Sequence, residues 1–331
     1  MTTLALLPDP SSPLDHATAL AAFGDMLDGR VADAEVADFL TRLSIREESA
    51  IEIAAAAQAL RERMFEVAAP SGAIDVCGTG GDGAHSLNVS TAVAIVVAAC
   101  GVPVAKHGNR AASSKAGAAD TLEALGLDLD RASATAEETL ADLGLCFLFA
   151  QKHHPALGRL APVRKAIGRR TIFNLIGPLC NPARVRRQLI GIARVDYLDT
   201  VAGAVELIGL DAAMLVSGEE SLDEISIAGP SRAIMIRPGH RAELRLTPED
   251  AGIERHGLDS ILGGDPAFNA RALRELLAGA VTPYRDAVLL NAAAALIVAG
   301  HVETMADGVE EAAEAIDRGL AKALLDCWIA Y

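Results

Sequence analysis

Apolar residues recur every three or four positions through the first 70 residues of the chain. One helical face holds Leu20, Phe23, Met26 and Leu27, and a second holds Val36, Phe39, Leu40 and Leu43. This spacing matches the period of an α-helix. Ser44 followed by Glu47 has the pattern of a capping box and predicts a third helix that runs toward Phe65. Because no strand pattern occurs there, we expect a small all-helical domain over residues 1–69.

The pattern changes after residues 69–72, where proline and glycine indicate a hinge or linker. Short β-prone runs then alternate with helical stretches, which is typical of an α/β domain. The expected strands are residues 73–77, 102–105, 146–149, 213–217 and 233–237. We expect residues 70–331 to form an α/β domain with a central, mostly parallel sheet flanked by helices. Residues 155–183, rich in glycine and proline, are expected to pack back on the helical domain, and residues 283–299 and 305–325 are expected as helices.

Composition and charge narrow the class of protein. The chain has 331 residues, of which 51% are hydrophobic and 22% charged, as in a packed globular protein of two domains. The net charge of −15 disfavours nucleic acid and anionic membranes as partners. The N-terminus lacks a signal-peptide pattern and no apolar run reaches about 18 residues, so we expect a cytoplasmic protein. The five cysteines form no CxxC pair, which favours reduced thiols.

A glycine-rich segment follows the first expected strand. Gly78, Gly80, Gly81 and Gly83 surround Asp82, and Asn88-Val89-Ser90-Thr91 then opens an apolar helix at residues 91–100. Glycines let backbone amides approach a ligand closely, and a helix N-terminus capped by Asn88 or Ser90 adds partial positive charge. The segment therefore predicts a phosphate site. The alternative is a tight turn that binds nothing, and the spacing fits neither a dinucleotide fingerprint nor a Walker A loop.

A basic segment follows the second expected strand, with the sequence Lys106-His107-Gly108-Asn109-Arg110 and then Ser113, Ser114 and Lys115. Ligands of open α/β sheets bind outside the carboxyl ends of the strands. The alternative is a solvated basic turn. We favour a binding role because the rest of the chain is so acidic.

Two further segments carry candidate chemistry. Asp223 and Glu224 follow a strand and suit magnesium, which takes few protein ligands, although an exposed acidic turn is the alternative. Arg164 could hold a carboxylate through two parallel hydrogen bonds. We interpret Arg169 and Arg170 as helix surface, and the pair of His153 and His154 as loop packing.

Taken together, these segments resemble the anthranilate phosphoribosyltransferase family. The resemblance covers nearly the whole chain and rests on residues 78–82, 88–91, 106–110, 163–165 and 223–224, with residues 285–291 near the end. It implies transfer of the phosphoribosyl group of 5-phosphoribosyl 1-diphosphate to the amine of anthranilate, in tryptophan biosynthesis. It also implies two Mg²⁺ ions per subunit and a homodimer formed through the helical domains.

The resemblance also implies roles for individual residues. Those expected to bind the sugar diphosphate are Gly78, Gly81, Asp82, Ser86, Asn88, Val89, Ser90, Thr91, Lys106, Gly108, Asn109, Arg110, Ser113, Ser114 and Ala118. Gly78, Asn109 and Arg164 would bind anthranilate. Lys106, His107 and Arg164 would be catalytic, and Ser90, Asp223 and Glu224 would bind the metal. Ala118, like Ala111 and Ala116, stands where the family commonly has serine, and His85 is an unusual residue in the phosphate loop, so we expect altered substrate affinity.

Two other functions share part of this pattern. A pyrimidine nucleoside phosphorylase has a similar basic loop, but usually has serine at the position of Gly108 and is usually longer, with an extra C-terminal domain. A non-catalytic relative that binds nucleic acid is opposed by Arg164, by the Asp223–Glu224 pair and by the negative charge. The lack of an evident nucleophile–base pair fits transfer to an aromatic amine, which is unprotonated at neutral pH.

Overall fold

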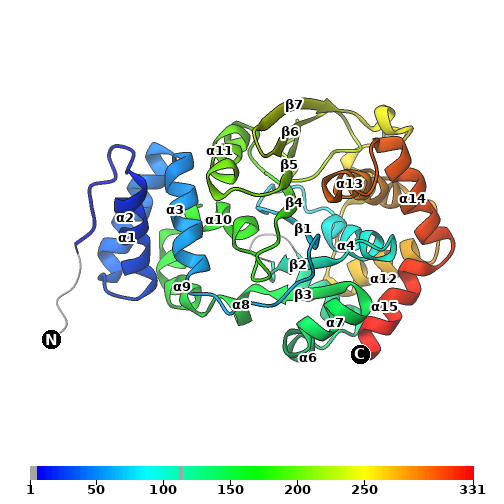
Figure 1. The fold of residues 1–331 in the computed structure, drawn as a ribbon, viewed down its shortest axis with the longest axis horizontal. Helices are drawn as coiled ribbons and strands as arrows, with labels where there is room; N and C mark the ends of the chain where they lie inside the picture. The colour runs from blue at the N-terminus through cyan, green and yellow to red at the C-terminus, as the bar shows by residue number, and fades with distance from the viewer. Residues whose placement is uncertain (1–5, 112–114) are drawn as a thin grey trace.

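A seven-stranded sheet lies at the centre of the computed structural model, which describes residues 6–111 and 115–331 (Figure 1). Within these residues the strands are β1 (Ile74–Gly78), β2 (Val104–Gly108), β3 (Leu145–Phe149), β4 (Arg187–Gly191), β5 (Ala212–Gly218), β6 (Ser231–Arg237) and β7 (His240–Leu246). Their order is β3-β2-β1-β4-β5-β6-β7. The first five are parallel, whereas β6 and β7 pair antiparallel at one edge.

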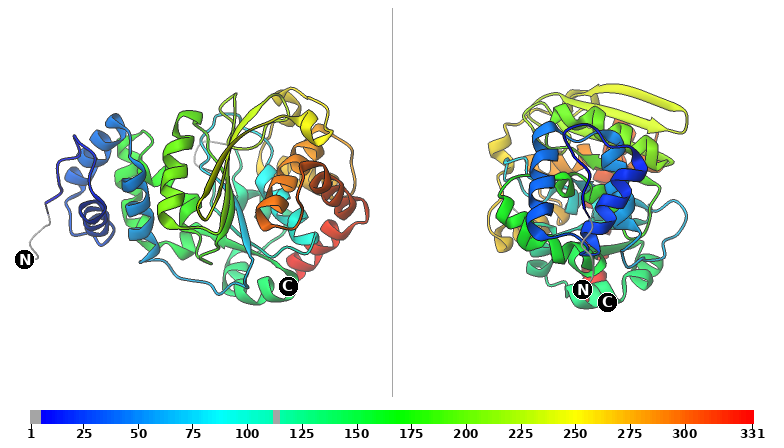
Figure 2. Two further views of the ribbon diagram at one scale, coloured as in Figure 1. Left: turned by 45° about the horizontal axis from the view of Figure 1, so that its top comes forward. Right: turned by 90° about the vertical axis from the view of Figure 1, so that its left-hand side faces the viewer.

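Helices cover both faces of this sheet and form a bundle at one end of the molecule (Figures 1 and 2). In chain order the α-helices are α1 (His16–Leu27), α2 (Asp33–Arg46), α3 (Ala50–Arg61), α4 (Val89–Ala99), α5 (Ala118–Leu125), α6 (Leu129–Ala134), α7 (Ala136–Leu143), α8 (Ala150–His153), α9 (Pro155–Ile167), α10 (Ile172–Leu175), α11 (Leu198–Ile208), α12 (Pro266–Leu277), α13 (Pro283–Ala299), α14 (Met305–Asp317) and α15 (Leu320–Ala330). Short 3₁₀ helices are η1 (Gly177–Cys180), η2 (Val195–Tyr197), η3 (Pro248–Ala251) and η4 (Leu258–Ile261).

Successive strand residues supply two different apolar cores. On β4, Leu189 joins the core beneath α4, α12 and α13, while the next residue, Ile190, joins the core beneath α11 and the helical bundle. This alternation follows from the two-residue period of a strand. Because both faces are covered, the central strands are buried along most of their length, as in other parallel sheets. The second core runs without a break from the sheet into the bundle.

The start of the third helix differs from the prediction. Helix α2 continues through Ser44, and the capping box is formed by Ser49 and Glu52 at the start of α3. The predicted Ser44–Glu47 box is therefore wrong. Ser44 Oγ instead donates to the Arg170 carbonyl at 2.8 Å, so this hydroxyl joins the bundle to a later segment of the chain.

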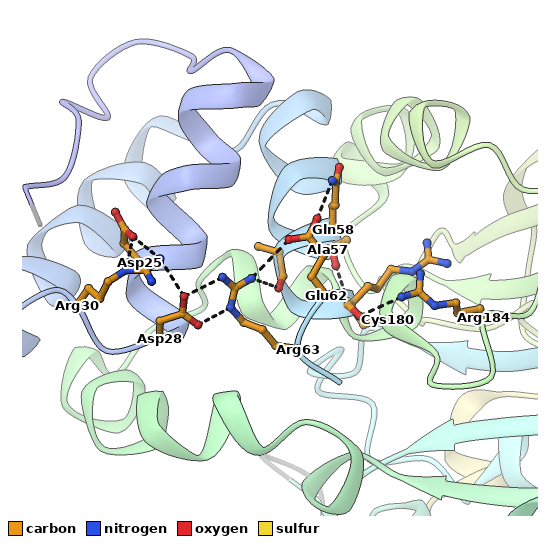
Figure 3. Close-up of polar contacts among 11 residues, drawn as sticks. Asp25, Asp28, Arg30, Ala57, Gln58, Glu62, Arg63, Cys180 and Arg184 are labelled. Carbon is orange, nitrogen blue, oxygen red and sulfur yellow. Dashed lines mark hydrogen bonds and ion pairs between the residues drawn. The ribbon is translucent and has the colours of Figure 1, made fainter. Parts of the chain in front are cut away.

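The segment between β3 and β4 leaves the sheet and packs on the bundle. Helix α9 contacts α1 and α2, and α10 and η1 contact α3. Figure 3 shows the end of α3, where Arg63 forms an ion pair with Asp28 at 2.6 Å. Nearby, the Cys180 thiol lies 3.7 Å from the Ala57 carbonyl and Arg184 Nη2 donates to the Arg61 carbonyl at 3.2 Å. The returning chain is thus held against α3 before it enters β4.

The predicted fold class is confirmed, with a helical domain and a mostly parallel sheet flanked by helices. Strands β4 and β7 were missed, and the helix expected over residues 305–325 is two helices separated at Gly319. None of the helices in the described residues is long and apolar enough to span a membrane. Since β1, β2, β4 and β5 are parallel, their carboxyl ends meet at one edge of the sheet, where the predicted loops lie.

Candidate functional site

The glycine-rich loop leaves the carboxyl end of β1 through left-handed residues. Gly80 and Gly81 have φ of 66° and 74°, which glycine adopts without steric cost. The Thr79 N–H donates to the Gly191 carbonyl at 2.9 Å, and the Ala193 N–H donates to Thr79 Oγ1 at 3.1 Å. The loop is therefore fixed to the end of β4. A backbone of this shape can present amides to an anion.

The start of α4 lies beside the acidic segment. Asn88 occupies the N-cap position, but its side chain makes no capping bond. Its Oδ1 accepts from Thr121 Oγ1 at 2.5 Å and from Asn269 Nδ2 at 2.9 Å. The Ser90 N–H donates to Glu224 Oε1 at 3.2 Å. The first turn of α4 therefore faces a carboxylate, and Asn88 joins it to α5 and α12.

Lys106 brings a buried positive charge to the same place. Its side chain is only 3% exposed, and Nζ donates to the Val76 carbonyl at 2.8 Å and to Ser90 Oγ at 3.3 Å. An ammonium has three donors, so two protein acceptors leave one N–H for a ligand. The next residue, His107, shares a hydrogen bond at 3.0 Å between Nδ1 and the Gly177 carbonyl. Burial lowers the pKa of His107 to about 3, so its ring is neutral.

Arg110, the next basic residue of this segment, is already paired. The Arg110 guanidinium forms ion pairs with Asp120 at 2.9 Å and with Glu123. It also lies 5.5 Å from the centre of the Phe149 ring. Asn109 is exposed, and its Oδ1 accepts from the Arg110 N–H at 2.8 Å. Asn109 is thus more accessible to a ligand than the Arg110 charge is.

Other predicted site residues take varied positions. The side chains of Val89 and Thr91 are buried in the core, so only their backbone could meet a ligand. Ser86 forms a bridge with Leu262 that supports the glycine-rich loop. Ala118 is the half-buried first residue of α5. Two further predicted residues lie outside the described part of the chain: Ser113 and Ser114.

The acidic pair lies against the glycine-rich loop. Asp223 Oδ2 accepts from the Gly80 N–H at 2.7 Å. Burial, followed by the charge of Asp82, raises the pKa of Asp223 to about 7, and burial with the charge of Asp223 raises the pKa of Glu224 well above its usual value. Glu224 Oε2 is buried and has no hydrogen-bond partner in the described residues. A cation placed here would relieve both the repulsion and the unpaired oxygen.

These carboxylates fit a cation that takes only part of its ligands from protein. Within residues 6–111 and 115–331, no group of three His, Cys, Asp or Glu residues has a geometry that could hold a metal ion. Magnesium commonly binds through one or two carboxylates together with water and substrate phosphates. The Asp223–Glu224 pair, beside an amide-rich loop and Lys106, has this character.

Arg164 is a half-buried cation near the bundle. It lies on α9, and its guanidinium is 5.9 Å from the centre of the Phe173 ring. Burial lowers its pKa, and no carboxylate of the described residues lies within ion-pair distance. An anionic ligand could supply that partner. The prediction that Arg170 is helix surface is wrong: Arg170 follows the end of α9, and its Nη2 is buried without a partner in the described chain.

Several buried polar residues near the site were not predicted. Asp75 and Asn181 are hydrogen-bonded to each other, and the Tyr284 hydroxyl donates to the Asn88 carbonyl at 3.0 Å. Asp75 gave a signal, since a carboxylate between Ile74 and Val76 interrupts an apolar strand. The sequence carries no comparable signal for Asn181 and Tyr284, because the residues they bind are distant along the chain.

Comparisons with known proteins agree with this geometry. Residues 71–322 match a model described as glycosyl transferase family, a/b domain, and residues 10–64 match glycosyl transferase family, helical bundle domain. Both domains of this class of transferase are therefore present. The chain is 64% identical over 327 residues to anthranilate phosphoribosyltransferase of Novosphingobium aromaticivorans, with 99% of each chain covered. It is 62% identical to that of Sphingopyxis alaskensis, with 100% of each covered.

Solved structures give the same result. The crystal structure of anthranilate phosphoribosyltransferase from Thermus thermophilus is 40% identical, with a TM-score of 0.90 over 97% of this chain and 96% of that one. The enzyme from Saccharomyces cerevisiae, in complex with PRPP and Mg, is 29% identical, with a TM-score of 0.86 over 95% and 91%. This chain belongs to the anthranilate phosphoribosyltransferase family.

Proposed function

We propose that the protein transfers the phosphoribosyl group of 5-phosphoribosyl 1-diphosphate to the amine of anthranilate. The products are N-(5-phosphoribosyl)anthranilate and diphosphate, and the reaction belongs to tryptophan biosynthesis. The observation that carries this proposal is the meeting of three chain-distant segments at Ser90, whose N–H donates to Glu224 and whose Oγ accepts from Lys106. A site with a buried cation, amides and carboxylates suits a diphosphate with its metal.

The leaving diphosphate gains negative charge as the bond to the sugar breaks. The Lys106 ammonium and the amides of the glycine-rich loop would stabilise that charge because they are already fixed in place by protein hydrogen bonds. We assign Gly78, Gly81 and Asp82 to this phosphate site. Burial of the lysine strengthens the interaction, since the local dielectric is lower than that of water.

We propose that Ser90, Asp223 and Glu224 hold magnesium, with two ions per subunit. Bound Mg²⁺ would neutralise diphosphate charge as the leaving group departs. Within the protein, the Gly80 and Ser90 amides orient the two carboxylates. The unpartnered Glu224 Oε2 is the oxygen best placed for a cation. The complex of the yeast relative with PRPP and Mg supports the use of this metal.

The acceptor would bind on the side of the helical bundle. We assign Arg164 to the anthranilate carboxylate, with Asn109 and the neutral ring of His107 beside it. A complex of the yeast relative with 4-fluoroanthranilate supports an aromatic acid as acceptor. The amine of such an acid is unprotonated at neutral pH, so positioning rather than a strong base would supply the acceleration.

Loss of anthranilate fluorescence after addition of the sugar diphosphate and Mg²⁺ tests the reaction. We expect turnover that requires both additions. Folded protein without turnover, beside an active relative as control, would contradict the assignment. The double substitution Asp223→Asn with Glu224→Gln should raise the Mg²⁺ requirement, and Thr139→Val, a buried substitution on α7, should leave it unchanged.

We further propose a cytoplasmic homodimer built through the helical domain, residues 1–69, with residues 155–183 as part of the same unit and residues 70–331 as the catalytic domain. Apolar side chains on the bundle and on the neighbouring helix α11 support this proposal, since Ile45 is 64% exposed and Leu207 is 58% exposed. Light scattering should give twice the 34.3 kDa chain mass, and a monomer at working concentration would contradict the dimer.

A further inference from the structure

Asp75 is a carboxylate on β1, a strand inside the sheet between β2 and β4. It is fully buried, and Oδ1 accepts from the His107 N–H at 3.0 Å while Oδ2 accepts from Asn181 Nδ2 at 2.8 Å. Burial raises the pKa of Asp75 to about 6, against the opposing charge of Lys106. A carboxylate is costly in this position, and an apolar residue would fill the space. The carboxylate differs from an apolar residue in that it accepts these two hydrogen bonds.

Asn181 is the second member of this pair. It is 3% exposed, and Nδ2 also donates to the Ala105 carbonyl at 2.8 Å, while Oδ1 accepts from the Ala183 N–H at 2.8 Å. Both amide donors and the amide oxygen are thus used. Because Ala105 lies on β2 and Asp75 on β1, one side chain joins the returning chain to two strands of the sheet.

The same turn is held at a second point. The Gly177 carbonyl and His107 Nδ1 form a hydrogen bond of 3.0 Å. Gln188 Nε2 donates to the Pro178 carbonyl at 2.7 Å. Because the Gly177 oxygen can only accept, Nδ1 carries the proton of the neutral ring. His107 is therefore fixed through its backbone by Asp75 and through its ring by the turn.

We infer that Asp75 and Asn181 are positioning residues for the transfer. Their hydrogen bond, which we call the Asp75–Asn181 link, would set the distance between the acceptor residues on the bundle side and the phosphate residues on the sheet. This inference rests on the proposed function, because it assigns Arg164 to one substrate and Lys106 to the other. Neither member of the link touches a reacting atom. Residues 177–183 connect the segment that carries Arg164 to β4, so this link, together with the His107–Gly177 and Gln188–Pro178 hydrogen bonds, joins the two halves of the site.

Asp75→Asn tests the link while keeping the size of the side chain. An asparagine at this position can accept from His107 through its oxygen, but it then turns an N–H toward the N–H of Asn181. We expect kcat/KM for anthranilate to fall by at least about tenfold, since small displacements of reacting groups have large effects on rate. KM for the sugar diphosphate should change by less than about twofold, because the contacts of Lys106 are intact.

Asn181→Ala tests the same link from the other side with Asp75 unchanged, and remains informative if Asp75→Asn does not fold. If both residues act through one hydrogen bond, the double variant should be no slower than the slower single variant. Thr139→Val is a matched control, since it removes a buried hydroxyl whose hydrogen bond, to the Ala136 carbonyl, stays within its own helix, and it should leave both KM values unchanged.

The outcomes separate this inference from the proposed function. Natural protein without turnover would defeat the proposed function itself. With active natural protein, folded variants that keep kcat/KM for anthranilate within about twofold would overturn the positioning role. So would a rise in KM for the sugar diphosphate as large as the loss of kcat/KM for anthranilate, or losses in the two single variants that multiply in the double variant, since these indicate general or independent damage.

Discussion

Gly78→Ala is the substitution with the most local expected effect on the site. Gly78 ends β1, and its φ lies outside the left-handed region, so its backbone tolerates alanine. A methyl group built there would lie 2.2 Å from Asp223 Oδ2 and 2.9 Å from its Cγ. Ordinary contact begins near 3.4 Å, so the carboxylate must retreat by roughly 1 Å. That movement breaks the 2.7 Å hydrogen bond from the Gly80 N–H.

The size of the effect follows from that hydrogen bond. A hydrogen bond to a charged group contributes about 1.5–3 kcal/mol, which corresponds to about 10- to 100-fold in a rate or binding constant. We expect the Mg²⁺ concentration for half-maximal activity to rise by about this factor. Thermal stability should change little, because the two closest contacts of the methyl group are to the Asp223 side chain, its backbone contact at 3.3 Å to the Asp223 carbonyl is only slightly tight, and no part of the apolar core is displaced.

The assay is the loss of anthranilate fluorescence at increasing Mg²⁺. Gly158→Ala is the matched control, since its methyl group meets nothing within 4 Å on the exposed surface of α9. There, alanine should raise stability by about 0.5–1 kcal/mol through helix propensity and leave the Mg²⁺ requirement unchanged. A Gly78→Ala enzyme with the natural Mg²⁺ requirement would refute the role of Asp223 in metal binding.

Three further predictions address the acceptor side, acid stability and the phosphate loop. Arg164→Ala should raise the anthranilate KM about 10- to 100-fold by removing a charge-assisted pair, with the sugar-diphosphate KM unchanged; equal KM values in variant and natural protein would remove this role. Burial lowers the pKa of His154 to about 4. Its neutral form therefore supports the folded state fully above the ordinary histidine pKa, and this contribution to the free energy of unfolding is lost as the pH falls toward about 4. Urea unfolding should therefore show His154→Leu gaining about 3 kcal/mol relative to the natural protein between pH 7 and 4, and a constant difference would contradict this. A methyl group on Gly263 would lie 2.7 Å from the Ser86 carbonyl, so Gly263→Ala should raise the sugar-diphosphate KM, and an unchanged KM would show that this loop is not held as described.

The sequence predicted most of the fold because its signals are local. Apolar periodicity located the bundle helices, and the alternation of β-prone and helical stretches indicated the α/β domain. Strand β7 was missed because it is an exposed edge strand, and Arg241, Glu243 and Arg245 interrupt its apolar pattern. Strand β4 begins with Arg187 and Gln188, which hides a short apolar run. The capping-box prediction at Ser44 was wrong because Ser44–Glu47 and Ser49–Glu52 both have the required spacing. The helix begins after the second pair opens, at Ala50.

The site was predictable only as far as its residues lie at or just after the carboxyl ends of strands. The second strand was expected to end at residue 105, but β2 extends to Gly108, so Lys106 and His107 lie on the strand and not in the loop after it. The positions of Asp223, Ser90 and Lys106 at one edge follow from a parallel sheet, whatever their distance along the chain. The use of each side chain did not follow, because hydrogen bonds between distant segments decide it. Arg110 illustrates this, since its guanidinium forms ion pairs with Asp120 and Glu123 on the next helix.

Ser90 joins the two charged halves of the site, and this leads to a last prediction. Its Oγ accepts from Lys106, which we assign to the leaving group, while its N–H donates to Glu224, which we assign to the metal. Ser90→Ala keeps the N–H and removes the hydroxyl, both as an acceptor for Lys106 and as a metal ligand. The Mg²⁺ requirement and the sugar-diphosphate KM should therefore rise together, by up to about 10- to 100-fold each, with the anthranilate KM unchanged. A rise in only one of them, measured in the fluorescence assay, would mean that cation and carboxylates act separately, and that Ser90 is packing rather than the residue that joins them.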